Sequence, residues 1–154
     1  MRENLTAGEL CTRVVTIAYP SMAIDEAARL MRERHVGCVV VVQEVSAKES
    51  VVVGVLTDRD IALGVVAADR DPHGMRVGDV MSKDVVKVRE EDSLPDVLAA
   101  MRRKGVRRVP VTGPQDVLVG ILALDDILAV LAQQMQTVAQ AVSAAACHER
   151  TALP

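Results

Sequence analysis

Apolar and polar residues follow one another along this chain in a pattern that occurs twice. Short apolar runs predict strands, and polar turns separate them, at 14–17, 38–42, 51–56, 85–88, 109–112 and 117–122. Apolar residues recur at the spacing of one helix face, which predicts two helices. These residues are Ile24, Ala27, Ala28 and Met31 in the first helix, and Leu94, Val97, Leu98 and Met101 in the second. Ser93, with Asp96 three residues later, is predicted to cap the second of these helices. Further helices are expected to begin near Asp58 and near Leu124, which gives the order β-α-β-β-α twice.

The two halves also match residue by residue. Residues 8–13 and 23–31 align with residues 78–83 and 93–101 at an offset of 70. The offset then falls to 66, and the difference, 70 − 66 = 4, corresponds to a longer turn within 43–50. One unit leaves much apolar surface uncovered, so we expect an α+β fold in which two tandem repeats pack sheet to sheet with pseudo-two-fold symmetry. The predicted organisation is a first repeat at 1–67, a linker at 68–76, a second repeat at 77–132 and a helical extension with a disordered end at 133–154.

The amino-acid composition limits the kinds of binding partner that are expected for this protein. Aromatic residues make up 1% of the chain, which argues against a surface that stacks nucleic-acid bases. The net charge of −3 gives no general attraction to polyanions or anionic membranes, and no segment approaches the length of a membrane span. Three scattered cysteines do not form a disulfide framework. A cytoplasmic protein with no nucleic-acid or membrane partner is therefore expected.

Catalytic and metal-binding patterns do not stand out in the sequence. His35, His73 and His148 are isolated and show no metal-ligand spacing. No Ser-His-Asp, Cys-His or paired-carboxylate arrangement suggests a nucleophile with its base. The chain is therefore predicted not to be an enzyme and to hold no metal.

The motif that closes each unit carries a family resemblance. Residues 54–61 read Gly-Val-Leu-Thr-Asp-Arg-Asp-Ile, and residues 120–127 read Gly-Ile-Leu-Ala-Leu-Asp-Asp-Ile, with Ala123 where Thr57 stands in the first copy. Together with the segments at 78–81 and 105–111, these motifs resemble a pair of cystathionine-β-synthase-type (CBS) domains, also called a Bateman module. The resemblance covers roughly residues 5 to 132.

This resemblance implies a regulatory binding module. Such pairs hold AMP, ADP, ATP or S-adenosylmethionine in clefts between the repeats, often form dimers, and usually control an attached enzyme or channel. Here it implies a free-standing homodimeric sensor or adaptor that acts on a separate, unidentified protein. No cofactor would be required, and Mg²⁺ would enter only with ATP.

Thr57 and Asp60 are the first candidate ligand residues. A strand that ends in Thr57, followed by a helix with Asp60 in its first turn, places a hydroxyl and a carboxylate beside the unpaired amides of a helix N-terminus. The carboxylate suits a ribose diol, and the hydroxyl and amides suit phosphate or ribose oxygens. The alternative is that Thr57 caps the helix and Asp60 complements its dipole. Asp126 is the second-copy equivalent, and Ala123 should weaken that site.

Arg107 and Arg108 are the candidate phosphate ligands, because a guanidinium group offers a planar fork of donors. The family pattern favours Arg108, in the second copy's site; the alternative is a solvated pair. Gly37 and Cys38 occupy these positions in the first copy, so unequal sites are expected. Adenine would lie on aliphatic walls formed by Val36, Val55, Val106 and Ile121.

A second function of a different class stays open: a structural or adaptor dimer with vestigial clefts. Ala123 in place of a hydroxyl residue supports it, as do Gly37 and Cys38 in place of a phosphate clamp. Cys11 and Cys38 are interpreted as core residues, with a redox switch between them as a variant.

The C-terminal tail continues the last helix in this interpretation. Residues 127–146 contain no Gly or Pro, and Ile127, Leu131, Met135 (or Gln134), Val138 and Val142 form an apolar stripe. The stripe is expected to pack on a second subunit or on the module itself, with a second subunit favoured, and the alternative is a frayed tail. Residues 148–154 are predicted to be disordered.

Overall fold

The structure is a computed structural model that describes residues 5–152, in two compact units, Met1–Leu122 and Ala123–Pro154. The first unit contains both repeats up to the sixth strand. The elements of the first repeat are α1 (Ala7–Leu10), β1 (Ile17–Ala18), α2 (Ile24–Arg34), β2 (Cys38–Glu44), β3 (Ser50–Thr57), α3 (Asp58–Ile61) and the π-helical turn η1 (Ala62–Val66). The connecting turn is η2 (Pro72–Gly74). The second repeat has α4 (Val77–Val80), β4 (Val88–Arg89), α5 (Leu94–Lys104), β5 (Arg108–Thr112), η3 (Pro114–Asp116) and β6 (Leu118–Ala123).

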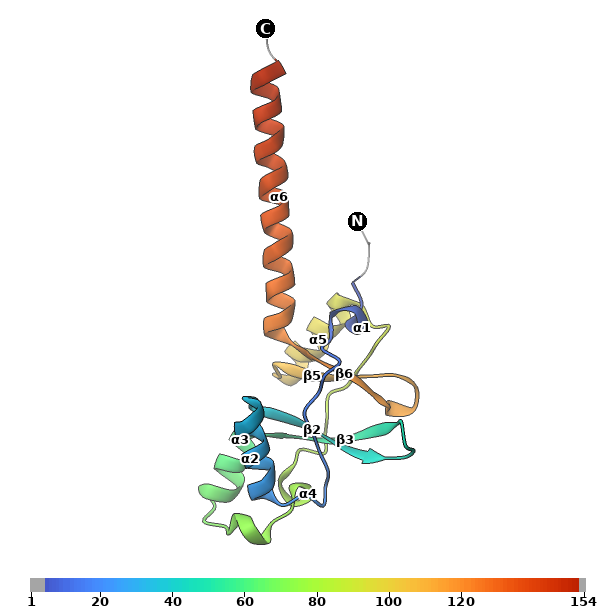
Figure 1. Cartoon of the computed structure of the whole chain (residues 1–154), viewed down its shortest axis with the longest axis vertical. Coiled ribbons are helices and arrows are strands. Elements are labelled where there is room, and N and C mark those ends of the chain that lie inside the picture. Colours follow the sequence, from blue (N-terminus) through green and yellow to red (C-terminus); the bar gives the residue numbers. More distant parts are fainter. Residues whose placement is uncertain (1–4, 153–154) are drawn as a thin grey trace. The chain divides into compact units, whose positions relative to one another are not determined.

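Each repeat forms a three-stranded sheet, with strand orders β1-β2-β3 and β4-β5-β6. Figure 1 labels the two longer strands of each sheet, β2 and β3 in the first repeat and β5 and β6 in the second. The first strand of each sheet runs parallel to the second, and β2 and β3 form an antiparallel hairpin. The predicted order of helices and strands is confirmed. The predicted strands at 14–17 and 85–88 are shorter, because ladder pairing is limited to Ile17–Ala18 and Val88–Arg89.

The long helices of the repeats begin and end for local reasons. Ser93 accepts a hydrogen bond from the Asp96 amide at 3.4 Å, so the predicted cap of α5 is confirmed. Both helices end at a residue in the left-handed conformation, His35 in α2 and Gly105 in α5, which lets two amides turn back to the last carbonyls. The apolar faces of the helices are buried in the core.

The two repeats exchange their leading segments. Thr6 pairs with Ser93 and Thr12 with Ile121, so the chain start crosses to the second repeat. In the same way, Arg76 pairs with Ala23 and Ser82 with Val55, so the start of the second repeat crosses back to the first. The paired positions are related by the sequence offsets of 70 and 66, which makes the exchange reciprocal and gives the unit its pseudo-two-fold symmetry.

The sheets pack against each other through a valine core. Val40, Val42 and Val52 of the first sheet are buried against partly buried residues of both repeats. Those from the second repeat are Val85, Leu118 and Ile121. The sheet-to-sheet packing expected from the duplication is therefore confirmed.

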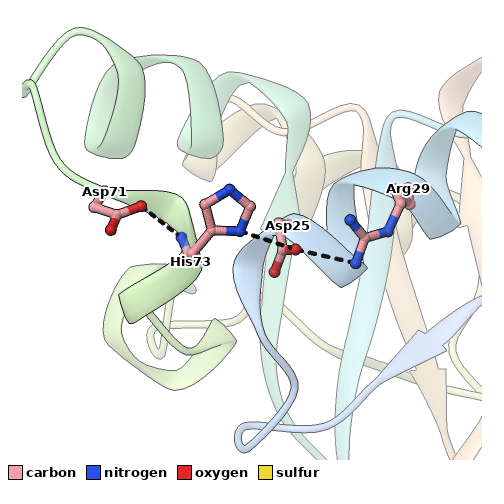
Figure 2. A network of polar contacts seen from close by, with 4 residues as sticks. All are labelled: Asp25, Arg29, Asp71 and His73. Carbon is pink, nitrogen blue, oxygen red and sulfur yellow. Dashed lines mark hydrogen bonds and ion pairs between the residues drawn. The ribbon is translucent and has the colours of Figure 1, made fainter.

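The linker between the repeats is tied to α2 by a polar network (Figure 2). Asp71 Oδ1 accepts a hydrogen bond of 3.0 Å from the His73 amide. His73 Nδ1 lies 3.3 Å from Asp25 Oδ2, and the same oxygen lies 3.0 Å from an Arg29 guanidinium nitrogen. Burial raises the pKa of the Asp25 carboxyl, but Arg29, the Glu26 amide and His73 together lower this pKa below its ordinary value.

The second unit is formed by α6 (Leu124–Ala152), a single uninterrupted helix drawn in orange to red in Figure 1. The prediction that the last helix extends past the repeat is confirmed. The prediction of disorder from 148 is wrong as far as 152, because the helical backbone hydrogen bonding continues to Ala152; residues 153 and 154 lie outside the described part. None of the described helices has both the length and the apolar character needed to cross a membrane.

Candidate ligand-binding cleft

A cavity of about 380 Å³ lies between the two repeats within the first unit. Its size falls in the range of about 300–1,000 Å³ that is usual for small-molecule sites. The first repeat contributes residues from β2, β3 and α3: Cys38, Val55, Thr57, Arg59 and Asp60. The second repeat contributes two segments that lead into β4 and β5: Ser82, Asp84, Val85 and Val86, and Gly105, Val106, Arg107, Arg108 and Pro110. The cavity thus has one wall from each repeat.

Thr57 and Asp60 form a capping box at the start of α3. The Asp60 amide donates to Thr57 Oγ1 at 3.1 Å, and the Thr57 amide donates to Asp60 Oδ2 at 2.9 Å. Both side chains are half-buried at the edge of the cavity. The capping role that was the alternative for this pair is therefore present. This cap uses one of the two carboxylate oxygens of Asp60, namely Oδ2.

The amides of the first turn of α3 are already used. The Asp58 amide donates to the Gly37 carbonyl at 3.0 Å, the Arg59 amide to Asp58 Oδ1 at 2.8 Å, and the Asp60 amide to Thr57. The sequence suggested that unpaired amides here would receive phosphate or ribose oxygens. That expectation is wrong for these three amides, because Gly37 and the two side chains satisfy them.

The apolar part of the cavity is anchored by a backbone bridge between the repeats. The Val55 amide donates to the Ser82 carbonyl at 3.1 Å, and the Ser82 amide donates to the Val55 carbonyl at 2.9 Å. Valines and one proline then face the space from both repeats, namely Val55, Val85, Val86, Val106 and Pro110. These side chains offer flat aliphatic contact to a planar ring without any aromatic residue.

Arg107 and Arg108 lie at an exposed part of the same cavity as Thr57 and Asp60. The sequence grouped Arg108 with Asp126 in a second-copy site, and the structure groups it with the first-copy pair instead. The physical reason is the packing of the two repeats against each other, which places the segment before β5 and the start of α3 around one cavity. The arginines and the ribose-type carboxylate therefore face one space.

Four of the ten predicted ligand residues lie elsewhere. Val36 packs against the core of the first repeat, and Ile121 packs between the sheets. Gly37 supports the start of α3: its carbonyl accepts the Asp58 amide, and a Cβ at residue 37 would lie 2.9 Å from Asp58 Oδ2. Asp126 belongs to the second unit, in the first turn of α6.

Sequence reasoning missed the residues that the crossing segment brings to the cavity, above all Ser82, Asp84, Val85 and Val86. Residues 85–88 were predicted as a strand, and their short ladder pairing leaves the preceding residues available to the other repeat. No local pattern distinguishes such a segment from an ordinary strand, so the signal was absent from the sequence.

Cys38 lies in the wall of the cavity and stays protonated at neutral pH. Burial raises the pKa of its thiol to about 11; the Arg108 guanidinium opposes this shift, and the Asp60 and Asp58 carboxylates add to it. Burial also raises the pKa of Cys11, which contacts the Gly8 carbonyl at 3.5 Å. Both cysteines are free thiols, as is Cys147. A protonated thiol is a poor nucleophile, so Cys38 acts in the cleft as a small wall residue.

Metal ligands do not gather in the part of the chain that the structure describes. No group of three or more His, Cys, Asp or Glu side chains is placed to hold an ion between residues 5 and 152. The charged side chains that line the cleft are the carboxylates of Asp60 and Asp84 and the guanidinium groups of Arg59, Arg107 and Arg108.

Comparison with known proteins identifies the family to which both repeats are similar. The CBS domain family model matches twice, at residues 7–66 and 77–133. A CBS domain-containing protein, YhcV of Bacillus subtilis, is 40% identical over 118 residues, which is 77% of this chain and 79% of that protein. An uncharacterized protein of Methanopyrus kandleri, MK0525, is 32% identical over 127 residues; the match takes in 82% of this chain and 63% of MK0525.

Among solved structures, the cytosolic domain of the Mg²⁺ channel MgtE in complex with ATP superposes with a TM-score of 0.69 at 28% identity. The superposition covers 84% of this chain and 49% of that one. The two family matches together span both repeats, and the alignments with these relatives are of similar extent. The likeness therefore covers the whole first unit and not only single motifs. This chain accordingly belongs to the CBS-domain family, as a tandem pair of CBS domains.

Proposed function

We propose that this protein is a regulatory module that binds an adenosyl ligand, preferably an adenine nucleotide, in the cleft between its two repeats. The observation that carries the proposal is the meeting of Asp60, an aliphatic wall and the pair Arg107 and Arg108 in one cavity, which Arg59 and Asp84 also line. These are the three kinds of group that a ribose, a purine ring and a phosphate require. The MgtE domain, which has the same fold, is in complex with ATP.

In this proposal the three kinds of group fix the orientation of the ligand in the cleft. Asp60 Oδ1 accepts a hydrogen bond from the ribose diol, while Oδ2 continues to hold the Thr57 amide. The adenine ring lies between the valines of the two repeats. The phosphate extends to Arg107 and Arg108, because the amides at the start of α3 are already paired.

The two guanidinium groups also rank the ligands. An anionic nucleotide gains charge-assisted hydrogen bonds from them, while S-adenosylmethionine carries no phosphate and brings positive charge to the same place. AMP, ADP and ATP are therefore expected to bind more tightly than S-adenosylmethionine. Mg²⁺ would enter only as the companion of ATP.

Binding rather than catalysis is the function proposed for the cleft. Among the described residues that line the cleft, Cys38 is the only one with a thiol, its raised pKa keeps that thiol protonated, and none is a histidine. A sensor also needs a ligand that prefers one arrangement of the protein over another. A cleft with one wall from each repeat meets this requirement, since a bound ligand contacts both repeats and favours one spacing between them.

A thermal-melt series tests the proposal directly. AMP, ADP, ATP with Mg²⁺, S-adenosylmethionine, NAD and GTP are each added to the wild type and to Asp60→Asn and Arg108→Ala. A ligand at 100 times its Kd stabilises the folded state by about 2.7 kcal/mol. For a chain of this length that raises Tm by roughly 5–10 °C. We expect the shift with an adenine nucleotide, reduced in both variants.

Two matched control variants test whether a reduced Tm shift is specific to residues that line the cavity. Arg103→Ala removes an exposed arginine of α5 that does not line the cavity, and Asp96→Ala removes a helix-start carboxylate away from it. Both controls should keep the ligand-induced shift. If no adenosyl compound raises Tm, or if Asp60→Asn and Arg108→Ala keep the full shift, the proposed site is rejected.

A structural or adaptor dimer is the second candidate function. The observation that favours it is the internal use of Thr57 and Asp60, whose hydrogen bonds already complete the cap of α3. This candidate predicts no ligand-induced shift and a partner protein that binds equally well to the wild type and to Arg108→Ala.

A further inference from the structure

A row of exposed apolar side chains runs along α6. Its members are Leu124, Leu128, Leu131, Met135, Val138 and Val142, with exposed fractions of 36%, 65%, 37%, 73%, 63% and 65%. Six large apolar residues on one face of one helix form a contiguous patch of a kind that soluble proteins rarely leave uncovered. We call this row the α6 stripe.

The spacing of the α6 stripe differs from the one expected from the sequence alone. Successive members are 4, 3, 4, 3 and 4 residues apart, which keeps them on one side of the helix as a heptad repeat does. Ile127, which the sequence placed in the stripe, is buried, and Leu128 is exposed in its place. A narrow row with alternating steps of three and four fits the side-by-side packing of two helices.

The composition around the α6 stripe argues for an identical partner. No Asp, Glu, Lys, Arg or His occurs from 128 to 147, so two copies of this segment bring no like charges together. The absence of charge also gives the surface nothing to attract an acidic or basic partner. Alanines stand directly after Leu131 and Val138, at positions that flank the row and allow close approach of a second helix.

We propose that α6 pairs with α6 of a second copy of this chain through the α6 stripe, as a two-stranded coiled coil. The helix is long enough for this contact, since 29 residues at about 1.5 Å each span roughly 43 Å. Pairing also supplies the helix with the packing that most helices need in water. This inference is independent of the ligand proposed for the cleft.

The test uses the full-length chain and two double variants with the same change of charge. Leu131→Glu/Val138→Glu places carboxylates in the α6 stripe. Gln133→Glu/Gln140→Glu places them on the opposite face of the same helix, where both glutamines are exposed. Sedimentation equilibrium over a range of concentrations gives the association state, and amide hydrogen exchange reports protection within 128–142.

We expect the wild type and the control variant, Gln133→Glu/Gln140→Glu, to sediment as dimers with protected α6 amides. The stripe variant should lose that protection, and its dimer should be weaker by at least about tenfold in Kd, which corresponds to 1.4 kcal/mol. If the modules also associate elsewhere, the exchange measurement still reads α6 alone. The ligand-induced rise in Tm should survive in the stripe variant, which separates this proposal from the function of the cleft.

Three results would overturn the proposal. One is equal association and equal α6 protection in both double variants. Another is a wild type that remains monomeric at every concentration. The third is protection of the 128–142 amides in a species that sediments as a monomer, because the helix would then be covered by its own chain.

Discussion

Gly120 lies against Cys11 so closely that a Cβ added at residue 120 would stand 2.6 Å from Cys11 Sγ and 2.7 Å from the Thr12 carbonyl oxygen. The same relationship occurs at Gly54, where a Cβ would stand 2.5 Å from Met81 Sδ. Each glycine belongs to one repeat and each sulfur-bearing side chain to the leading segment of the other. The glycine of the closing motif is therefore the place where the exchanged segment crosses.

Gly120→Ala should destabilise the fold by about 1–3 kcal/mol, because the added methyl overlaps a backbone carbonyl that has little room to move. Gly74→Ala is the matched control, since a Cβ there meets nothing within 4 Å. Urea denaturation followed by circular dichroism measures both. Equal midpoints for the two variants would show that the crossing segment yields without cost.

Substitution of Asp60 can distinguish its role in capping α3 from its proposed role in binding the ligand. In Asp60→Asn the amide oxygen can still accept the Thr57 amide, so the free energy of unfolding should stay within about 0.5 kcal/mol of the wild type. Thr57→Ala removes the cap hydroxyl and should cost about 0.5–2 kcal/mol. Nucleotide affinity, measured by calorimetry, should fall in Asp60→Asn all the same. A stable Asp60→Asn protein with undiminished affinity would reduce Asp60 to a capping residue.

Cys38 should react slowly with iodoacetamide at neutral pH. Because its pKa is raised to about 11, only a very small thiolate fraction is present at pH 7.5. The rate, followed by peptide mass spectrometry against free glutathione, should rise by about tenfold per pH unit up to pH 10 without a plateau. A bound nucleotide should slow the reaction further, because Cys38 lines the cavity. A plateau below pH 9 would contradict the assigned environment.

The linker should loosen in acid. The pKa of Asp25 is lower in the folded protein than its ordinary value of 3.8, so its ionised form stabilises the contact with His73 and Arg29 above that value. This contribution is lost as the pH falls through the lower folded-state pKa. Amide exchange within 68–76, corrected for its intrinsic pH dependence, should rise only below about pH 4 in the wild type.

Two variants of neighbouring residues complete the linker experiment. Asp25→Asn should show faster exchange in the linker already at pH 6, because the contacts of the Asp25 carboxylate with Arg29 and His73 are lost. Glu26→Gln, a change of an exposed carboxylate beside Asp25, should behave as the wild type does. Identical linker exchange in all three proteins would mean that the network in Figure 2 does not hold the linker.

Much of the fold could be predicted from the sequence because its signals are local. The spacing of Ile24, Ala27 and Met31 identifies α2 from a few consecutive turns, and the Ser93 cap follows from its hydroxyl and the helix that begins after it. The offset between the two halves likewise needs only a comparison of the chain with itself. Thr57 and Asp60 are identified as candidate ligand residues by their position between a strand and a helix, and both line the cavity.

The composition of the candidate cleft was decided by the tertiary structure. Arg108 of the second repeat lines a cavity whose other wall comes from the first repeat, because the two repeats pack against each other. Val85 and Val86 reach the same space because they follow Ser82, which pairs with Val55 of the first repeat. The pairing of the α3 amides with Gly37 and with the capping side chains also arises only when separate segments meet. A sequence determines which residues can form a strand, a helix or a cap, since those depend on neighbours along the chain. Which of these residues share one cavity depends on contacts between distant segments, and those are fixed by the packing of the two repeats.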